Sequence, residues 1–275
     1  MEIHRSFNIR DRLEELTNNL DELETAHFRG EQVVELSTVD FVSPLSILPL
    51  TVQANLWDMK INCTEQNTDI RRYLKTIGFQ QGVTTLSSSD KRYLPIARLS
   101  FAEDHVITKY ENNILASLGG GRDMDCINLL TDELIGNVEE HAEVDHFWIL
   151  AQYYQKRRTC ELVIVDTGVG YKKSYEGTEF EVNTDAEAIY NALEGRSSKS
   201  TIEDKVVRGQ GIPTISRIYT EGYGGKLIIL SGTSMVYRKQ NETKEIALRS
   251  NYLGSVVCIN YKFDATRQVD YREYF

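Results

Sequence analysis

Residues 131–141 read T-D-E-L-I-G-N-V-E-E-H and are the stretch on which the fold assignment depends. Glu133, Asn137 and His141 are spaced four residues apart, so on an α-helix they lie on one face with a drift of only about 40° per step. An adjoining stripe at helical spacing is apolar and consists of Ile127, Leu130, Leu134 and Val138. The pattern predicts a helix over 123–142 that packs on one side and presents an acid, an amide and an imidazole on the next.

These three polar side chains suit chemistry on a phosphate-bearing substrate. The Glu133 carboxylate can hold a water molecule and accept its proton. The amide oxygen of Asn137 is a hard ligand suited to Mg²⁺, which keeps several waters and takes few protein ligands beside substrate phosphates. The same spacing also fits an ordinary solvated face, and the helix alone favours neither interpretation.

The segment after this helix predicts a strand hairpin that ends in an acid and two glycines. Residues 146–154 and 161–165 are rich in β-branched and aromatic residues, and the Lys156-Arg157-Arg158 turn between them indicates antiparallel pairing. Asp166, Gly168 and Gly170 follow at once. A carboxylate there can accept a hydrogen bond from an exocyclic amine such as that of adenine, and the glycines let the backbone approach a flat ring.

A second pair of glycines follows a long polar segment. Residues 171–207 contain one predicted helix, at 185–194, and a loop of this length is typically disordered or a functional lid. Gly209 and Gly211 then precede a helix that is predicted to run to about Tyr219. Free N–H groups and the helix dipole favour an anion at such a position.

The end of the chain predicts two more strands, at 225–231 and 254–260, with a polar hairpin between them at 232–251. A further helix is predicted at 101–118, before the opening stretch. Residues 264–275 form a polar tail.

The first third of the chain alternates helices with short strands. Helices are predicted at 8–28, 44–59 and 68–77, and strands at 32–36, 39–42 and 61–64. Ser43 and Pro44 fit an N-cap and a first-turn proline, and Gly78 closes the third helix. Strand–helix–strand–helix order implies parallel strands with helical crossovers. Residues 80–97, rich in Ser, Thr and Gly, are the candidate domain boundary.

This first third resembles the STAS domain of anti-sigma-factor antagonists. Residues 74–79 read L-K-T-I-G-F and are similar to the Leu-x-x-x-Gly-Phe that ends a later helix in that family. The family's phosphorylatable turn is replaced here by V-S-P-L-S at 42–46, so the resemblance implies an interaction module without the usual phosphoswitch. Ser43 and Ser46 are predicted to cap a helix rather than to accept phosphate.

The order of motifs over residues 100–262 resembles the GHKL ATPase superfamily, which includes gyrase, Hsp-type chaperones, sensor histidine kinases and anti-sigma-factor kinases. The resemblance implies a Bergerat-fold α/β sandwich, with a mixed sheet covered by helices, that binds ATP and Mg²⁺. The implied organisation is a STAS-like α/β domain at 1–82, a linker at 83–98, the ATP-binding domain at 99–263 and a tail at 264–275.

The resemblance also implies a role for each matching residue. Asn137 corresponds to the Mg²⁺ ligand, and Glu133 to the general base. Asp166 corresponds to the adenine-reading aspartate, and Ser255 to the hydroxyl that supports adenine through water. Two glycine boxes and three groups near the phosphates complete the implied site: Gly168, Gly170, Gly209, Gly211, His141, Lys199 and Arg208.

Some of these roles remain open at the level of sequence. His141 is either structural or a phosphate contact, and Lys199 is either a phosphate contact or a solvated loop lysine. The second glycine box reads G-Q-G-I-P, in which Pro213 replaces the family's final glycine.

Composition narrows the function classes. The chain has 275 residues, 41% hydrophobic and 26% charged, and its net charge of −10 argues against binding to a nucleic-acid backbone. We expect a cytoplasmic protein without a membrane segment, whose four scattered cysteines are reduced thiols. The expected partners are ATP and a regulatory protein, STAS or other, and a homodimer is compatible with the sequence.

Three uses of ATP compete. The first is a slow ATPase or switch, in which lid closure changes contacts with a partner or with the STAS-like module. The alternative is an anti-sigma-type serine/threonine kinase that acts on a STAS partner. A sensor histidine kinase is disfavoured because none of the five histidines is followed by Glu or Asp. A type-two topoisomerase or mismatch-repair function is disfavoured by the acidic charge.

Overall fold

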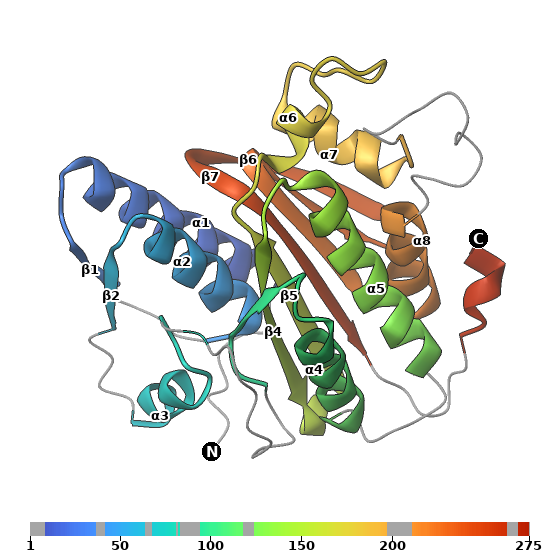
Figure 1. Ribbon diagram of the computed structural model, residues 1–275, viewed down its shortest axis with the longest axis horizontal. Coiled ribbons are helices and arrows are strands. Elements are labelled where there is room, and N and C mark those ends of the chain that lie inside the picture. Colours follow the sequence, from blue (N-terminus) through green and yellow to red (C-terminus); the bar gives the residue numbers. More distant parts are fainter. Residues whose placement is uncertain are drawn as a thin grey trace.

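A five-stranded antiparallel sheet with helices on both faces forms the centre of the computed structural model (Figure 1). The structure describes residues 9–36, 42–63, 68–80, 82, 94–117, 124–196, 211–262 and 269–274. The sheet has the strand order β3-β4-β5-β7-β6. Its strands are β3 (Ala97–Ser100), β4 (His146–Tyr154), β5 (Thr159–Asp166), β6 (Lys226–Lys239) and β7 (Glu242–Lys262).

The prediction of a mixed sheet is wrong, because every neighbouring pair in this sheet is antiparallel. Two hairpins, β4–β5 and β6–β7, supply four of the strands, and a short turn between neighbours imposes antiparallel pairing. The predicted hairpin over 146–166 is confirmed, and Arg158 takes a left-handed conformation (φ 52°) in its turn. β3 begins within the residues expected to be a linker and was not predicted.

The last two strands are far longer than predicted. Residues 232–251, expected to be a polar hairpin, are strand except for the turn at 240–241. Buried and exposed residues alternate along the outer part of β7, which made its sequence resemble a polar loop. The pairing slips at Gly232, whose φ of 57° permits the bulge.

Both faces of the sheet are apolar, so both must be covered. Along β5, Leu162 and Ile164 point to one face, while Val163 and Val165 point to the other, and all four are buried. The first face is covered by α4 (Asp104–Ser117), α5 (Met124–His141), α7 (Asp185–Leu193), α8 (Gly211–Arg217) and the π-helical turn η2 (Ile218–Gly222). Among the described residues, no helix is both long enough and apolar enough to cross a membrane.

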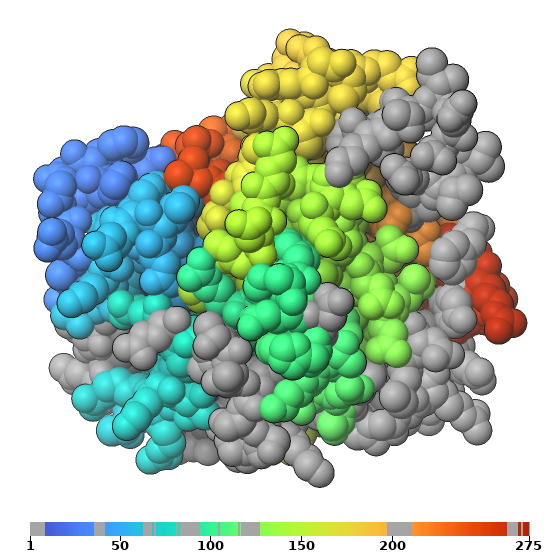
Figure 2. Space-filling view, in the orientation of Figure 1, coloured from blue at the N-terminus to red at the C-terminus, as the bar shows by residue number. Residues whose placement is uncertain are grey.

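The second face is covered by the N-terminal layer, which consists of α1 (Ile9–Phe28), β1 (Val33–Leu36), α2 (Pro44–Leu56), β2 (Lys60–Cys63) and α3 (Thr68–Thr76). β1 and β2 pair in parallel, as predicted. The strand predicted at 39–42 lies outside the described residues, except for Val42, which precedes α2 without strand pairing. One buried cluster joins residues of this layer to the sheet, and Figure 2 shows the layer packed directly against the rest of the chain.

The predicted helix cap at the start of α2 is confirmed. The Ser43 hydroxyl accepts from the N–H of Ser46 at 3.3 Å, and the Ser46 hydroxyl accepts from the N–H of Ser43 at 2.8 Å. This reciprocal pair is a capping box built from two serines. Both side chains are almost fully buried, at 0% and 2% exposure.

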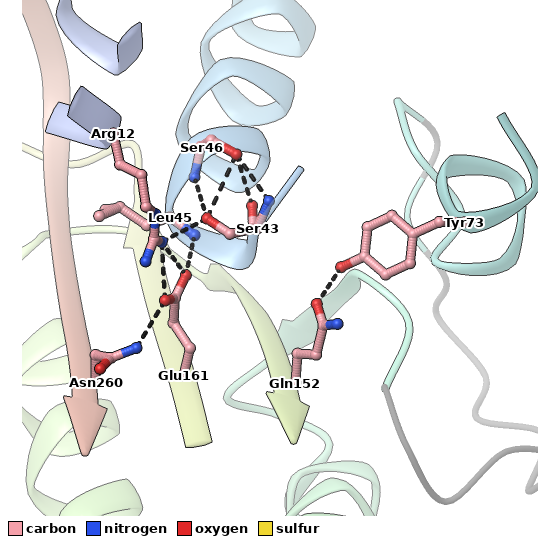
Figure 3. A network of polar contacts seen from close by, with 8 residues as sticks. All are labelled: Arg12, Ser43, Leu45, Ser46, Tyr73, Gln152, Glu161 and Asn260. Atoms are coloured by element: carbon pink, nitrogen blue, oxygen red, sulfur yellow. Dashed lines mark hydrogen bonds and ion pairs between the residues drawn. The ribbon is translucent and has the colours of Figure 1, made fainter. Parts of the chain in front are cut away.

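A buried ion pair ties the N-terminal layer to the sheet (Figure 3). Nη2 of Arg12 on α1 lies 2.6 Å and 2.8 Å from the two carboxylate oxygens of Glu161 on β5, and 2.5 Å from the Ser43 hydroxyl. Glu161 also accepts from the N–H of Leu45 at 3.0 Å and from the Asn260 amide at 2.9 Å. Every polar contact that a buried carboxylate needs is therefore supplied by α1, α2 and β7.

This pairing keeps Glu161 ionised. Burial would raise the pKa of its carboxyl, but the Arg12 charge, the Leu45 N–H and the Asn260 amide together hold the pKa below its ordinary value. Burial opposes the charge on Arg12, and the Glu161 carboxylate outweighs it and raises the guanidinium pKa.

Candidate functional site

The helix predicted from residues 131–141 is present as α5 and has the predicted two faces. Its apolar stripe is buried, with Ile127, Leu130, Leu134 and Val138 each at most 7% exposed. Glu133, Asn137 and His141 are half-buried on the neighbouring face. The helix therefore presents the acid, the amide and the imidazole at the border of the core.

The start of α8 lies against two of these side chains. A Cβ at Gly211 would collide with the Glu133 carboxylate and would lie 3.5 Å from Nδ2 of Asn137. Nδ2 of Asn137 also donates to the main-chain oxygen of Glu133 at 2.6 Å, which leaves its carbonyl oxygen Oδ1 as the atom suited to a cation. The structure thus brings together the predicted base, the predicted metal ligand and Gly211, the described residue of the second glycine box.

Glu133 is in a setting that favours its protonated form. Partial burial raises the pKa of its carboxyl, and the neighbouring Asp132 and Glu140 raise it further by like-charge repulsion. A carboxyl with a raised pKa is better matched to proton transfer near neutral pH than an ordinary glutamate is.

Asp166, at the end of β5, is 2% exposed, and each of its carboxylate oxygens accepts a hydrogen bond from within the chain. Its Oδ1 accepts from the N–H of Gly168 at 2.8 Å, and its Oδ2 accepts from the hydroxyl of Ser255, its cross-strand partner on β7. Burial raises the pKa of Asp166, although both hydrogen bonds oppose the shift. A carboxylate can accept about four hydrogen bonds, so an amine donor can still be added.

The first glycine box forms a tight turn between β5 and the short helix α6 (Gly170–Ser174), which was not predicted. A Cβ at Gly168 would collide with the main-chain oxygen of Ala142, directly after α5, and the N–H of Val169 donates to that oxygen at 3.1 Å. Gly170 has a φ of 74°, and a Cβ there would lie 2.7 Å from Oγ of Ser231. The turn therefore fits closely between the end of α5 and Ser231, in the interior of β6.

Two residues of this region were missed by sequence reasoning. Oγ of Ser231 on β6 accepts from the N–H of Tyr171 at 3.0 Å and donates to the carbonyl of Gly254 at 3.1 Å. Gly254 has a φ of 96°, and a Cβ there would collide with the main-chain oxygen of Asp166. The only sequence signal was the Gly254-Ser255 pair, of which only the serine was assigned a role.

The remaining predicted residues are placed in part. His141 lies at the C-terminal end of α5, 3.9 Å from the carboxylate of its neighbour Glu140. Lys199, Arg208 and Gly209 fall in 197–210, outside the described residues. The predicted site thus consists of two described groups, Glu133–Asn137–Gly211 and Asp166–Gly168–Gly170–Ser255, which α5 borders along its length.

The donor set fits a cation that arrives with a phosphate ligand. In the part of the chain that the structure describes, no group of three or more His, Cys, Asp or Glu residues could hold a metal by itself. The Asn137 amide oxygen and the neighbouring Glu133 carboxylate would be only two protein ligands. Mg²⁺ binds with so few protein ligands when phosphates and waters complete its coordination.

We expect Gly168→Ala to destabilise the protein by about 1–3 kcal/mol, because its methyl group has no room beside the fixed carbonyl of Ala142. Gly136→Ala on α5 is the matched control, since nothing lies within 4 Å of a Cβ there. Alanine in a helix stabilises by about 0.5–1 kcal/mol relative to glycine. The urea concentration at the midpoint of unfolding should therefore fall for Gly168→Ala and rise for Gly136→Ala. Equal shifts in the two variants would contradict the close contact at Gly168.

Comparison with known proteins adds no assignment. No family model matches the chain, and no curated protein and no solved structure is significantly similar to it.

Proposed function

We propose that this protein binds Mg-ATP between α5, the β5–α6 turn and the start of α8, and hydrolyses it slowly as a regulatory switch. The observation that supports the proposal is the approach of Gly211 to Glu133 and Asn137. A base and an amide ligand on α5 thereby lie beside a glycine that is more than 70 positions later in the sequence. The order of these groups is the one that the GHKL resemblance implies.

Each group has a defined task in this proposal. Asp166 accepts a hydrogen bond from the exocyclic amine of adenine, and Ser255 orients the carboxylate by donating to it. The backbone at Gly168 and Gly170 borders the ring, and the backbone at Gly211 borders the phosphates. Mg²⁺, when bound, neutralises phosphate charge. Glu133 accepts the proton of the attacking water.

Nucleotide binding can be tested by thermal unfolding of the full chain with millimolar ATP and MgCl₂. A ligand present at about 100 times its Kd stabilises the folded state by about 2.7 kcal/mol, so the melting temperature should rise. GTP is the control, because its ring presents a carbonyl oxygen where Asp166 requires a donor. No shift with ATP, or an equal shift with GTP, contradicts the proposal.

Glu133→Gln should retain the ATP-induced shift in melting temperature and reduce phosphate release by about a hundredfold, since general base catalysis typically contributes at least that factor. A general base is active only when it is deprotonated, and the pKa of Glu133 is raised. Turnover by the unaltered protein should therefore increase with pH, over a pH range above that in which an ordinary glutamate titrates. Glu139→Gln, an exposed change on the same helix, is the control. Persistent turnover in Glu133→Gln would remove Glu133 from the role of base.

A serine/threonine kinase is the second candidate, and the α2 cap bears on its substrate. Ser43 and Ser46 occupy the turn where STAS proteins carry their phosphoacceptor, yet both are buried and bonded in the capping box. In this structure neither serine is accessible as a phosphoacceptor, which favours a separate protein as the substrate of a kinase. Incubation with labelled ATP and STAS proteins distinguishes the two candidates, because a kinase transfers label to protein whereas a switch releases free phosphate.

A further inference from the structure

The two outer edges of the small β1–β2 sheet differ. The N–H of Lys60 donates to the oxygen of Gln32 at 2.9 Å, which fixes the direction of the main-chain groups in both strands. Successive residues of a strand direct these groups to opposite sides, so Ile61 directs its groups away from β1. The side-chain amide of Gln80 satisfies them: its Oε1 accepts from the N–H of Ile61 at 3.2 Å, and its Nε2 donates to the Ile61 oxygen.

The edge formed by β1 has no such cover in the described part of the chain, where β1 pairs with β2 alone. By the same alternation, Val33 and Glu35 direct their N–H and C=O groups away from β2. In Figure 1, β1 lies at the outer margin of the molecule, on the left. An open strand edge of this kind is a template for an added strand.

The side chains beside this edge are acidic around an apolar centre. Val33 is 45% exposed, and exposed Glu35, two positions further along the strand, shares its face. Exposed Glu31 lies just before the strand begins. A groove runs between this edge and α1, where Asp21, Glu22 and Arg29 line it. Four carboxylates and one guanidinium therefore line the groove. Asp21 accepts from the N–H of Ser250 at 2.9 Å, Glu35 accepts from the Asn62 amide at 2.8 Å, and Arg29 lies 3.9 Å from Glu31, so the groove keeps an excess of negative charge.

We propose that β1 is a docking edge for an extended, basic segment of another protein, which adds to the sheet as a third strand. Cross-strand neighbours of Glu31, Val33 and Glu35 would follow a basic–apolar–basic pattern, because opposite charges and apolar pairs stabilise facing positions. The edge hydrogen bonds supply affinity, and the carboxylates select the sequence. A second copy of this acidic chain would place like charges opposite one another and is disfavoured.

The test begins with selection of a displayed library of nine-residue peptides on the immobilised full chain. Enriched peptides should contain Lys or Arg at alternate positions around a β-branched residue. Each enriched peptide is synthesised with a fluorescent label, and its binding is followed by anisotropy. Methylation of alternate peptide nitrogens should weaken binding by about tenfold or more, since it removes main-chain donors.

Two variants of the protein complete the test. Val33→Pro removes an N–H that points away from β2, so it should leave the fold intact and weaken peptide binding by about tenfold or more. Glu22→Lys/Glu31→Lys should weaken binding of basic peptides and favour their glutamate counterparts. Glu139→Lys, at an exposed position of α5 on the other face of the sheet, should change nothing.

Three results overturn the proposal. The first is enrichment of peptides without the basic pattern, and the second is unchanged binding to Val33→Pro. The third is a dimer of the unaltered chain, seen by sedimentation, that Val33→Pro dissociates, because the edge would then belong to a second copy.

Discussion

Replacing Arg12 with methionine is expected to lower the free energy of unfolding by about 3–5 kcal/mol, because it leaves the Glu161 carboxylate buried without its counter-ion. Glu161 is fully buried, and Arg12 is 4% exposed. The change also removes the donor to the Ser43 hydroxyl and so weakens the attachment of α1 to α2. Urea denaturation at pH 7 measures the loss, and Arg10→Met, at an exposed position of the same helix, is the control.

The pH dependence identifies the cause of this loss. In the unaltered protein the pKa of Glu161 is lowered, so its contribution is present above the ordinary carboxyl range and is lost as pH falls through the folded-state pKa. Without Arg12, burial raises that pKa, and the variant gains relative stability as pH falls. The difference between the two proteins should therefore shrink on acidification.

A second substitution should restore most of the lost stability. In Arg12→Met/Glu161→Gln the buried charge is gone, while the glutamine oxygen can still accept from the N–H of Leu45. The double variant should therefore be more stable than Arg12→Met alone. A double variant that is no more stable than the single one would mean that packing of the Arg12 chain, and not the unpaired carboxylate, dominates.

Asp166→Asn is expected to weaken ATP binding by about a hundredfold or more without loss of stability. An asparagine that accepts from the N–H of Gly168 must direct its amide nitrogen toward Ser255 and the bound ring, where it opposes a donor. The ATP-induced rise in melting temperature should disappear at millimolar nucleotide.

The stability of this variant separates a binding role from a structural one. Burial raises the pKa of Asp166, so its ionised form lowers the stability of the folded protein. The protonated carboxyl contributes to the free energy of unfolding below the ordinary carboxyl range, and this contribution is lost as pH rises through the raised pKa. Asparagine removes that cost, so the melting temperature without nucleotide at pH 7 should be equal or higher. Asp145→Asn, at an exposed position, is the control. Unfolding of Asp166→Asn would assign the aspartate to the fold instead.

Local features of the structure could be predicted from the sequence because short-range physics decides them. The periodicity of residues 127–141 gives α5 its two faces, and Ser43 with Pro44 marks the start of α2. The hairpin over 146–166 follows from two β-rich segments around a short turn. Each of these signals lies within about twenty residues.

Features set by distant pairing could not be predicted in the same way. The four residues of β3 carry too little pattern to distinguish them from a linker, and their pairing with β4 makes them a strand. Arg12 looks like any polar residue of an amphipathic helix until Glu161, 149 positions later, is placed beside it. The same holds for the candidate site. Its residues could be named from sequence motifs, but the contact of Gly211 with Glu133 could not be predicted because it depends on how α8 packs against α5.

The burial of α2 has a consequence for the synthesis of the protein on the ribosome. Eleven consecutive residues of this helix, Pro44 to Ala54, are buried, and they emerge well before the β5 strand on which they pack. Until β4, β5 and β7 have been translated, α1 and β2 are present to pack against this apolar helix, but the side that packs on the sheet is uncovered. Nascent chains of this protein should therefore be substrates for chaperones that hold exposed apolar segments.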